Sequence, residues 1–208
     1  MDLDRPLTVV APTVDADALA VLAGAAAPFS GRQVHQLAGR HSERGIRNAL
    51  HRLHQQGIVI RERAGSSDLF RLNRDHLAAR HIEAIARLRS ELFDRITKEL
   101  DTWTVPPQFA AVFGSAARGG MRPDSDIDLF VVRPDEVDPD SEGWRSQLAD
   151  LTGKVTAWTG NDCRVLELAG SEVRAGSSAS SRVLGDIRTS GIVLHGPASY
   201  LRRNDHHG

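Results

Sequence analysis

The most informative stretch of this chain is residues 113–129, which read FGSAARGGMRPDSDIDL. A Gly-Ser turn follows one apolar run and an Asp-Ser-Asp-Ile-Asp segment opens another, so we predict strands over residues 109–113 and 127–132. Side chains two apart on a strand face the same way, and we therefore expect Asp126 and Asp128 to point together. Neighbouring carboxylates repel unless a cation lies between them, and Mg²⁺ prefers carboxylate oxygens while keeping positions open for phosphate. Asp126 and Asp128 are thus candidate metal ligands.

The Gly-Ser turn supplies groups that suit a phosphate. Gly114 lets the backbone approach closely, the Ser115 hydroxyl can donate a hydrogen bond, and the next two N–H groups open a short helix whose N-terminus favours anions. Arg118 fits two roles: it adds positive charge to a phosphate, or it pairs with Asp124 or Asp126 as a structural support. The spacing alone does not choose between these two roles.

The pattern Gly-Ser-x-x-Arg-Gly … Ser-Asp-Ile-Asp-Leu resembles the signature of the DNA polymerase beta-like nucleotidyltransferase superfamily, especially its small, minimal members. The similarity extends loosely over residues 105–196. The resemblance implies a mixed sheet flanked by helices, nucleotide-binding roles for Gly114, Ser115 and Arg118, and catalysis by the two aspartates with Mg²⁺. It also implies transfer of a nucleotidyl group from a nucleoside triphosphate to an acceptor, with release of pyrophosphate. Protein, RNA and small-molecule acceptors all stay open.

Active members of this superfamily usually carry a third carboxylate on the next strand, where it completes the metal site and can act as a base. Here that strand is predicted over residues 163–168, and Glu167 is our candidate for the third catalytic carboxylate. Asp162 is the alternative, and in another register the position falls on Arg164, which would put a positive charge where a metal ligand belongs. Without a third acid the domain would bind a nucleotide but transfer nothing, so enzymatic activity stays open at this point.

The first third of the chain shows the element order of a winged helix-turn-helix. We predict helices over residues 15–24, 30–38 and 42–56, followed by a hairpin of strands over residues 58–63 and 68–72. Ser30 and Ser42 offer N-caps to the second and third helices. The pattern Ser-Gly-Arg-x-Val … Ala-Leu-x-x-Leu-x-x-x-Gly-Ile-Val also resembles that family, and the match covers roughly residues 15–75.

The third of these helices has a polar face that suits DNA. The candidate DNA-binding residues are Arg44, Arg47, Asn48, His51 and Arg52 on this helix, with Arg61 and Arg63 on the hairpin. In the major groove, arginine forms bidentate hydrogen bonds with guanine and asparagine does so with adenine. Arginines on the hairpin can reach phosphates or the minor groove. The alternative is a solvated polar face on a domain that serves protein contacts or dimerisation.

We predict four segments along the chain: a winged helix-turn-helix DNA-binding domain over residues 1–75, a connecting helix over 76–104, a nucleotidyltransferase-like domain over 105–200, and a polar tail over 201–208. The connecting segment carries one apolar stripe, typical of a helix packed on both domains or of a dimerisation helix. The third segment should also hold helices over residues 141–158 and 181–189 and a strand over 192–194. The predicted fold class is α+β.

Composition narrows the possibilities further. The chain has 208 residues, with 40% hydrophobic and 25% charged residues and a formal net charge of −1, so any nucleic-acid-binding patch must be local. Because Cys163 is the only cysteine, an intrachain disulfide is excluded and a cysteine-based zinc site is disfavoured. No apolar run approaches the roughly 18 residues of a membrane span. We expect a cytoplasmic protein without a membrane partner.

These patterns predict a DNA-binding protein with a magnesium-dependent nucleotidyltransferase domain whose partners are a nucleoside triphosphate and DNA. The alternative is a transcriptional regulator or antitoxin whose nucleotidyltransferase-like domain binds a nucleotide or a partner without catalysis. A second copy of the chain is a further candidate partner, because the connecting helix has the apolar stripe of a dimerisation helix.

Overall fold

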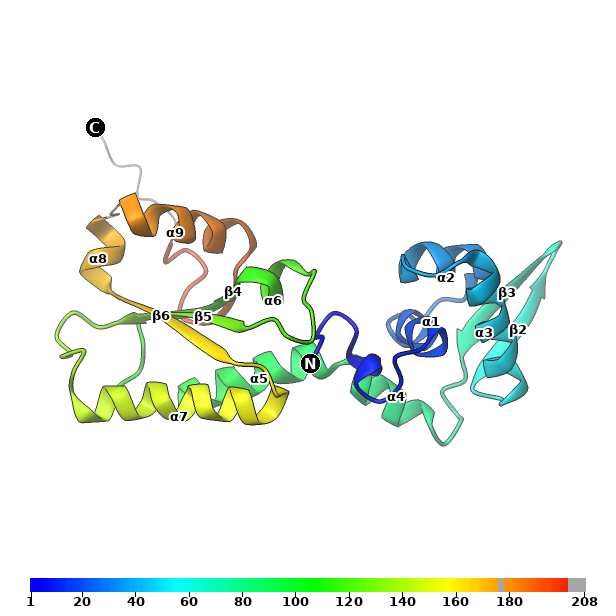
Figure 1. Ribbon diagram of the computed structural model, residues 1–208, viewed down its shortest axis with the longest axis horizontal. Coiled ribbons are helices and arrows are strands. Elements are labelled where there is room, and N and C mark those ends of the chain that lie inside the picture. The colour runs from blue at the N-terminus through cyan, green and yellow to red at the C-terminus, as the bar shows by residue number, and fades with distance from the viewer. Residues whose placement is uncertain (176–177, 202–208) are drawn as a thin grey trace. The chain divides into compact units, whose positions relative to one another are not determined.

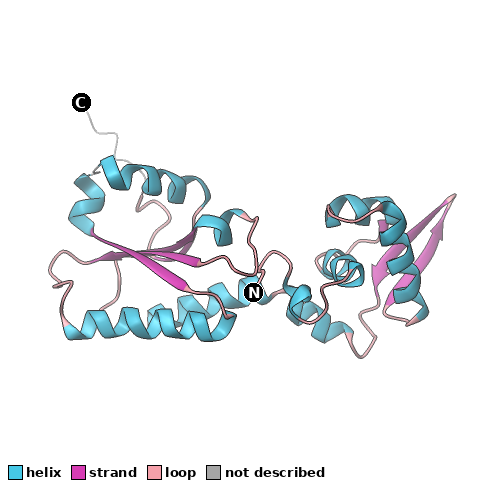
Figure 2. Ribbon diagram, viewed as in Figure 1, coloured by secondary structure: helices cyan, strands magenta, loops and turns pink. Residues whose placement is uncertain are grey.

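The structure, a computed structural model, describes residues 1–175 and 178–201. The chain divides into two compact units (Figure 1), one made of Asp2 and residues 4–89 and the other of Met1, Leu3 and the described residues from Ser90 onward. The predicted α+β fold class is confirmed, since both units combine helices with a sheet (Figure 2). No helix in the described ranges has the length and apolar character needed to cross a membrane.

The N-terminal unit packs helices against a small antiparallel sheet. Its elements are η1 (Pro6–Val9), α1 (Val14–Ala23), β1 (Phe29–Ser30), α2 (Gly31–Ala38), α3 (Glu43–Gln55), β2 (Val59–Ala64), β3 (Ser67–Leu72) and α4 (Ala79–Ala86). The strand order is β1-β3-β2. The predicted helices and hairpin are confirmed, and β1 adds a short third strand. The 3₁₀ turn η1 precedes the first helix, and its Pro6 and Leu7 are buried.

Local signals in the sequence explain where these helices begin. The Ser30 side chain accepts the Gln33 N–H while the Gln33 side chain accepts the Ser30 N–H, which forms a capping box on α2. Ser42 caps α3 by accepting the Gly45 N–H at 3.0 Å. The buried side of α3 joins α1, α2 and the hairpin in one core, which contains Leu22, Val34, Ile46, Leu50 and Leu72. The opposite side of α3 is left exposed.

The connecting helix predicted over residues 76–104 is instead two helices. The chain turns at residues 73–78, where the Asn73 side chain accepts the Asp75 N–H, and α4 starts only at Ala79. A second break falls at Arg87, with φ −95° and ψ 6°, before α5 (Leu88–Asp101). Within α5 the apolar stripe is present, because its buried residues recur every four positions at Leu92, Ile96 and Leu100.

The C-terminal unit contains a four-stranded mixed sheet. After α5 its elements are β4 (Phe109–Phe113), α6 (Gly114–Arg118), β5 (Ile127–Arg133), α7 (Glu142–Thr159), β6 (Cys163–Ala169), α8 (Gly170–Ala175), α9 (Ser178–Ser190) and β7 (Ile192–His195). The order is β6-β5-β4-β7, with β5 and β6 parallel and the other pairs antiparallel. All predicted elements of this segment are confirmed, while α8 was not predicted.

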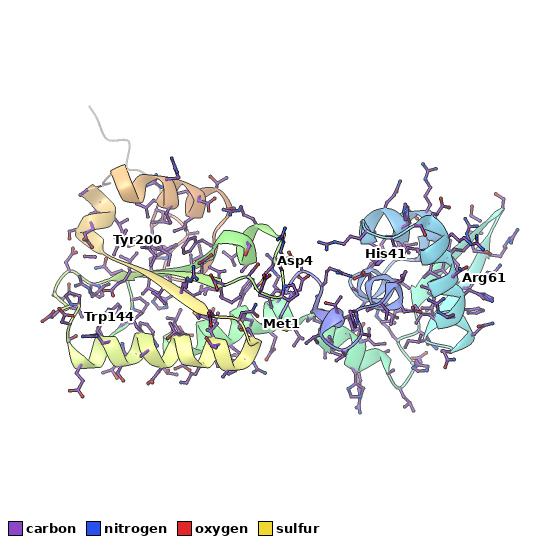
Figure 3. The ribbon with its side chains drawn as sticks, in the orientation of Figure 1. Met1, Asp4, His41, Arg61, Trp144 and Tyr200 are labelled. Carbon is purple, nitrogen blue, oxygen red and sulfur yellow. The ribbon has the colours of Figure 1, made fainter. Side chains whose placement is uncertain are left out.

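Alternation along β5 assigns its side chains to two cores. Ile127, Leu129 and Val131 pack in a cluster with residues of α5 and α7, which includes the fully buried Trp144. Phe130 and Val132 belong to a second cluster that includes residues of α8 and α9. Figure 1 shows α5 and α7 on one face of the sheet and α8 and α9 on the other, and Figure 3 labels Trp144 on the α7 side and Tyr200 on the other side.

The predicted polar tail falls mostly outside the described residues. Leu201 is the exception, since it is 5% exposed and packs in the cluster on the α9 face. Tyr200 stacks on Phe109 with ring centroids 5.3 Å apart, and its hydroxyl donates to Gln108 Oε1 at 2.6 Å. The segment up to Leu201 is therefore part of the folded unit.

Candidate active site

The two aspartates of the loop–strand junction lie on one face of the sheet. Asp126 directly precedes β5 and Asp128 is its second residue, so both share a parity with Phe130 and face the α9 side. Burial and the neighbouring charge of Asp126 raise the pKa of Asp128 above its ordinary value, and the charges of Arg164 and Arg118 offset this only in part. The pair therefore holds unbalanced negative charge at the end of a strand.

The Gly-Ser turn is held directly against Asp128. The last residue of β4, Phe113, pairs with Asp128 across the antiparallel ladder, and Gly114 follows with a φ of 68°. A Cβ at position 114 would lie 2.3 Å from Asp128 Oδ2, closer than two such atoms can approach. Glycine is thus required twice, once by the left-handed backbone and once by the carboxylate. Ser115 follows in the first turn of α6, partly exposed beside the aspartates.

Arg164 lies directly across from Asp128 on the neighbouring parallel strand. Its guanidinium Nη2 is 2.9 Å from Asp126 Oδ2, and its side chain is 71% exposed. The observed register is therefore the alternative in which the position beside the aspartates is occupied by Arg164. A positive charge stands where a third carboxylate was sought.

Glu167 is not brought to the aspartates, which corrects its prediction as the third carboxylate. It pairs with Val131 in the register, on the opposite face of the sheet from Asp128. Its carboxylate instead accepts a hydrogen bond from Arg133 Nε at 2.7 Å. Arg133 is a buried cation, so Glu167 serves as its counter-ion in the fold.

The alternative acid, Asp162, contributes backbone rather than a third ligand. Its carbonyl accepts the Ile127 N–H at 2.8 Å, which starts the β5–β6 ladder, and its side chain is exposed. Among the residues that the structure describes, no group of three or more His, Cys, Asp or Glu side chains is arranged to hold a metal ion. Asp126 and Asp128 are the two acids of the predicted set that the structure brings together.

Arg118 takes a structural partner other than the two considered from sequence. Its guanidinium pairs with Asp186 of α9 rather than with Asp124 or Asp126. This contact ties α6 to α9 and leaves the Arg118 side chain 48% exposed. Its charge still acts on the pKa of Asp128, so the guanidinium belongs to the electrostatic surroundings of the site.

Asn161 supports the aspartate loop and was missed by the sequence reasoning. It is 3% exposed, and its Nδ2 donates to the carbonyls of Pro123 at 3.0 Å and Ser125 at 2.8 Å. These bonds fix the backbone that leads into Asp126. The available signal was its place after Gly160, which ends α7 in the left-handed conformation and directs the next polar residue inward.

Four of the predicted DNA-binding residues lie on the exposed side of α3, and part of the hairpin lies beside them. Arg44, Arg47, Asn48 and His51 are exposed on α3. A hollow of about 280 Å³ lies between α3 and the hairpin, lined by Arg47, Asn48, His51, His54, Arg61, Asp68 and Phe70. Figure 3 labels Arg61 on the hairpin. The α3 residues therefore form one polar surface together with part of the hairpin.

Several of these arginines are paired with acids inside the unit. Arg52 Nη2 is 2.7 Å from Asp15 Oδ2 of α1, so this side chain braces the helices. Asp68 lies between the two hairpin arginines, 2.7 Å from Arg61 and 3.5 Å from Arg63. Arg47 pairs with Glu43 one turn earlier on α3 at 3.0 Å. Arg44 and Asn48 show no such partner within the described part of the chain.

A mixed four-stranded sheet with paired aspartates against a Gly-Ser turn defines the C-terminal unit as a fold of the nucleotidyltransferase type. Residues 93–159 match the family model described as the nucleotidyltransferase domain. This span includes β4, the Gly-Ser turn, both aspartates and α7, and it ends before Arg164.

Two crystal structures resemble part of the chain. One, a toxin–antitoxin complex with AMP-PNP, is 24% identical with a TM-score of 0.38 and covers 52% of this chain and 77% of its own. The other, a mutant of the toxin–antitoxin pair MntA-HpeT, is 23% identical with a TM-score of 0.37 and covers 50% of this chain and 73% of its own. Both likenesses are too distant to support a functional argument. No curated protein matches the chain.

Proposed function

We propose that the C-terminal unit binds a nucleoside triphosphate with Mg²⁺ and transfers its nucleotidyl group to an acceptor hydroxyl. The observation that carries this proposal is the pair Asp126 and Asp128, held side by side against the backbone of Gly114. In the transfer, the acceptor oxygen bonds to the α-phosphorus, the bond from that phosphorus to the β-phosphate oxygen breaks, and pyrophosphate leaves. The hydroxyl proton passes to solvent or a base.

The residues present fit one divalent cation. Asp126 and Asp128 offer carboxylate oxygens, the donors that Mg²⁺ prefers, and their mutual repulsion is relieved when a cation lies between them. The remaining positions of a metal ion in such a site are filled by phosphate and water. When bound, the ion neutralises the charge that develops on the triphosphate during transfer.

The chain's own groups then orient the triphosphate. Gly114 lets the backbone come close to the phosphates, and the Ser115 hydroxyl, in the first turn of α6, donates a hydrogen bond to one of them. Arg118 and Arg164 both act on the charge of Asp128 and are near enough to add positive charge at the phosphates. In the described residues the two aspartates are not joined by a third carboxylate in a metal-binding group, and Asp186 on the same side of the sheet is paired with Arg118.

The test of transfer uses the full chain with each of the four ribonucleoside triphosphates, labelled at the α-phosphate, in the presence of MgCl₂ and a cell lysate. Label should pass into protein, RNA or a small molecule in the wild type, and should not in Asp128→Ala. Asp124→Ala is the matched control, because Asp124 is an exposed aspartate of the same loop. Equal labelling by wild type and Asp128→Ala would rule out this site as the source of transfer.

For the N-terminal unit we propose a winged helix-turn-helix that binds DNA through α3 and the hairpin. Three helices followed by a hairpin, with exposed Arg44 and Asn48 on α3, support this proposal. The test measures binding of duplex DNA across a salt series. The logarithm of the binding constant should fall linearly with the logarithm of the salt concentration, with a slope of about −0.9 per phosphate contact. Binding that does not respond to salt would contradict a DNA interface of this kind.

A second candidate function is favoured by Arg164. An arginine beside Asp126, with no metal-binding group of three acids among the described residues, suits a domain that binds a nucleotide and leaves it intact. Such a chain would be a transcriptional regulator or an antitoxin that senses nucleotide or a partner. Nucleotide binding that depends on Asp128, without transfer of label to any acceptor, would select this second function.

A further inference from the structure

We propose that the Arg164 guanidinium supplies the positive charge of a second divalent ion, so that the site binds a nucleoside triphosphate with a single metal ion. This inference rests on the proposed nucleotide binding. It concerns the number of metal ions and the residue that makes one ion sufficient.

The geometry places a permanent cation between the potential ligands of a second ion. Arg164 is the direct register partner of Asp128, on the adjacent strand of a parallel pair whose strands lie about 4.8 Å apart. Its Nη2 lies 2.9 Å from Asp126 Oδ2, so one of the four carboxylate oxygens already accepts a hydrogen bond. A second metal ion would have to replace this bond and stand next to a guanidinium, which does not lose its proton in proteins.

The ligands for a second ion are also missing. Two ions close together are usually bridged and held by several carboxylates, but in the described residues no third His, Cys, Asp or Glu joins Asp126 and Asp128 in a metal-binding group, and Asp186 on this side is paired with Arg118. Glu167 points to the other face and neutralises Arg133. Three oxygens that remain after the Arg164 contact suffice for one ion completed by phosphate and water.

The charges balance with one ion and the arginine. Asp126 and Asp128 carry two negative charges, Arg164 one positive charge and a metal ion two, which leaves one positive charge to meet the triphosphate. A guanidinium is also a fork of donors that fits phosphate oxygens in pairs. Because the Arg164 side chain is 71% exposed, its N–H groups that do not contact Asp126 are open to phosphate oxygens.

The experiment counts bound metal ions rather than activity. Free Mn²⁺ is measured by electron paramagnetic resonance while Mn²⁺ is titrated into the full chain with a saturating non-hydrolysable triphosphate. After correction for the Mn²⁺ that free nucleotide binds without protein, the wild type should bind one Mn²⁺ per protein-bound nucleotide. Arg164→Lys should do the same. Arg164→Asp, which gives the face a third acid, should bind two.

Nucleotide affinity gives a second readout. Arg164→Ala should weaken binding of the Mn²⁺–nucleotide about 10- to 100-fold, the effect of losing hydrogen bonds to a charged group. Arg164→Lys should lose less because it keeps the charge. Circular dichroism checks that each variant is folded, and the wild-type count decides the matter even if a variant is not.

The outcomes separate the two proposals. Two Mn²⁺ ions in the wild type, or unchanged nucleotide affinity in Arg164→Ala, would overturn the role of Arg164 while leaving nucleotide binding intact. Absence of any Mn²⁺–nucleotide binding by the wild type would instead overturn the proposed function, and the inference with it.

Discussion

The two units of this chain hold their charged groups in different ways. At the start of β5, Asp126 and Asp128 are held together, and the pKa of Asp128 is raised by burial and by its neighbour. On the N-terminal unit, Arg52 is paired with Asp15, and Arg61 and Arg63 share Asp68. Negative charge is concentrated at the two aspartates and is only partly compensated. In the N-terminal unit, by contrast, much of the positive charge of the arginines is compensated by acids of the same unit.

This difference indicates where a charged ligand would gain most binding free energy. A cation that reaches Asp126 and Asp128 relieves a repulsion already present in the folded chain. A DNA phosphate that approaches Arg61 must compete with Asp68, an acid 2.7 Å away. The number of arginines in a stretch of sequence therefore overstates the charge that is available to a partner, and Arg44 is the better probe of the DNA face.

The largest effect is expected for Asp128→Asn. Removing this charge should lower metal-dependent nucleotide turnover by about a hundredfold or more, as for other preorganised charged groups in active sites. Initial rates at saturating nucleotide and Mg²⁺ measure this. Asp124→Asn is the control, and a similar loss in that variant would show that the effect belongs to the loop as a whole.

In the absence of metal, Asp128→Asn should be more stable to unfolding than the wild type. Because the folded-state pKa of Asp128 lies above the ordinary value of 3.8, the unfolded chain ionises first as pH rises. The free energy of unfolding should thus fall as pH increases from 3.8 through the raised pKa, and the penalty should remain at neutral pH. Asp128→Asn should lack this contribution, and a rise of about 2–4 °C in Tm would correspond to roughly 1 kcal/mol. A lower Tm would contradict the unbalanced charge.

A somewhat smaller effect is expected for Gly114→Ala. The new Cβ would lie 2.3 Å from Asp128 Oδ2, so the carboxylate or the turn must move. The left-handed backbone alone should cost about 1–3 kcal/mol, and displacement of Asp128 should weaken nucleotide binding as well. Calorimetric titration with nucleotide and Mg²⁺ measures the latter.

Gly120→Ala separates strain from displacement. Gly120 also has a positive φ, 84°, but a Cβ there would meet no atom within 4 Å. This variant should lose stability while nucleotide affinity is kept. If both glycine variants bind nucleotide as the wild type does, the close contact of Gly114 with Asp128 has no role in binding.

Most of the fold could be predicted because its signals are local. Ser30 and Ser42 mark helix starts through caps that span three residues, and the alternation of β5 gives the shared face of Asp126 and Asp128. The break at Arg87 could not be predicted, since no proline or glycine stands there to mark it. Local patterns therefore identified the elements better than their continuity.

The part of the site that depends on register could not be predicted. Glu167 and Arg164 stand three residues apart on one strand, and only the pairing of β6 with β5 decides which of them lies beside Asp128. A shift of one residue exchanges the faces, and the sequence of a single strand does not specify its partner's alignment. The pairing of Arg52 with Asp15, 37 positions away, could not be predicted because it depends on how α1 packs against α3.

A smaller effect is expected when the two kinds of arginine on α3 are compared. Arg44→Ala should weaken DNA binding by about 1–3 kcal/mol at most and reduce the salt slope by about 1. Arg52→Ala should leave DNA affinity unchanged, because its guanidinium is paired with Asp15 of α1. Fluorescence anisotropy over a salt series measures both variants. A larger loss for Arg52→Ala than for Arg44→Ala would reverse the assignment of these two residues.

The smallest effect on function is expected for Glu167. Its carboxylate accepts from Arg133 on the face opposite Asp128, so Glu167→Gln and Glu167→Ala should leave nucleotide turnover unchanged. Their cost should appear in the free energy of unfolding, where Glu167→Ala leaves buried Arg133 without its partner and should lose about 1–3 kcal/mol. Glu167→Gln keeps a neutral acceptor and should lose less. If turnover fell in both variants with stability unchanged, Glu167 would act at the reacting groups after all, and the β5–β6 register would have to differ in the active protein.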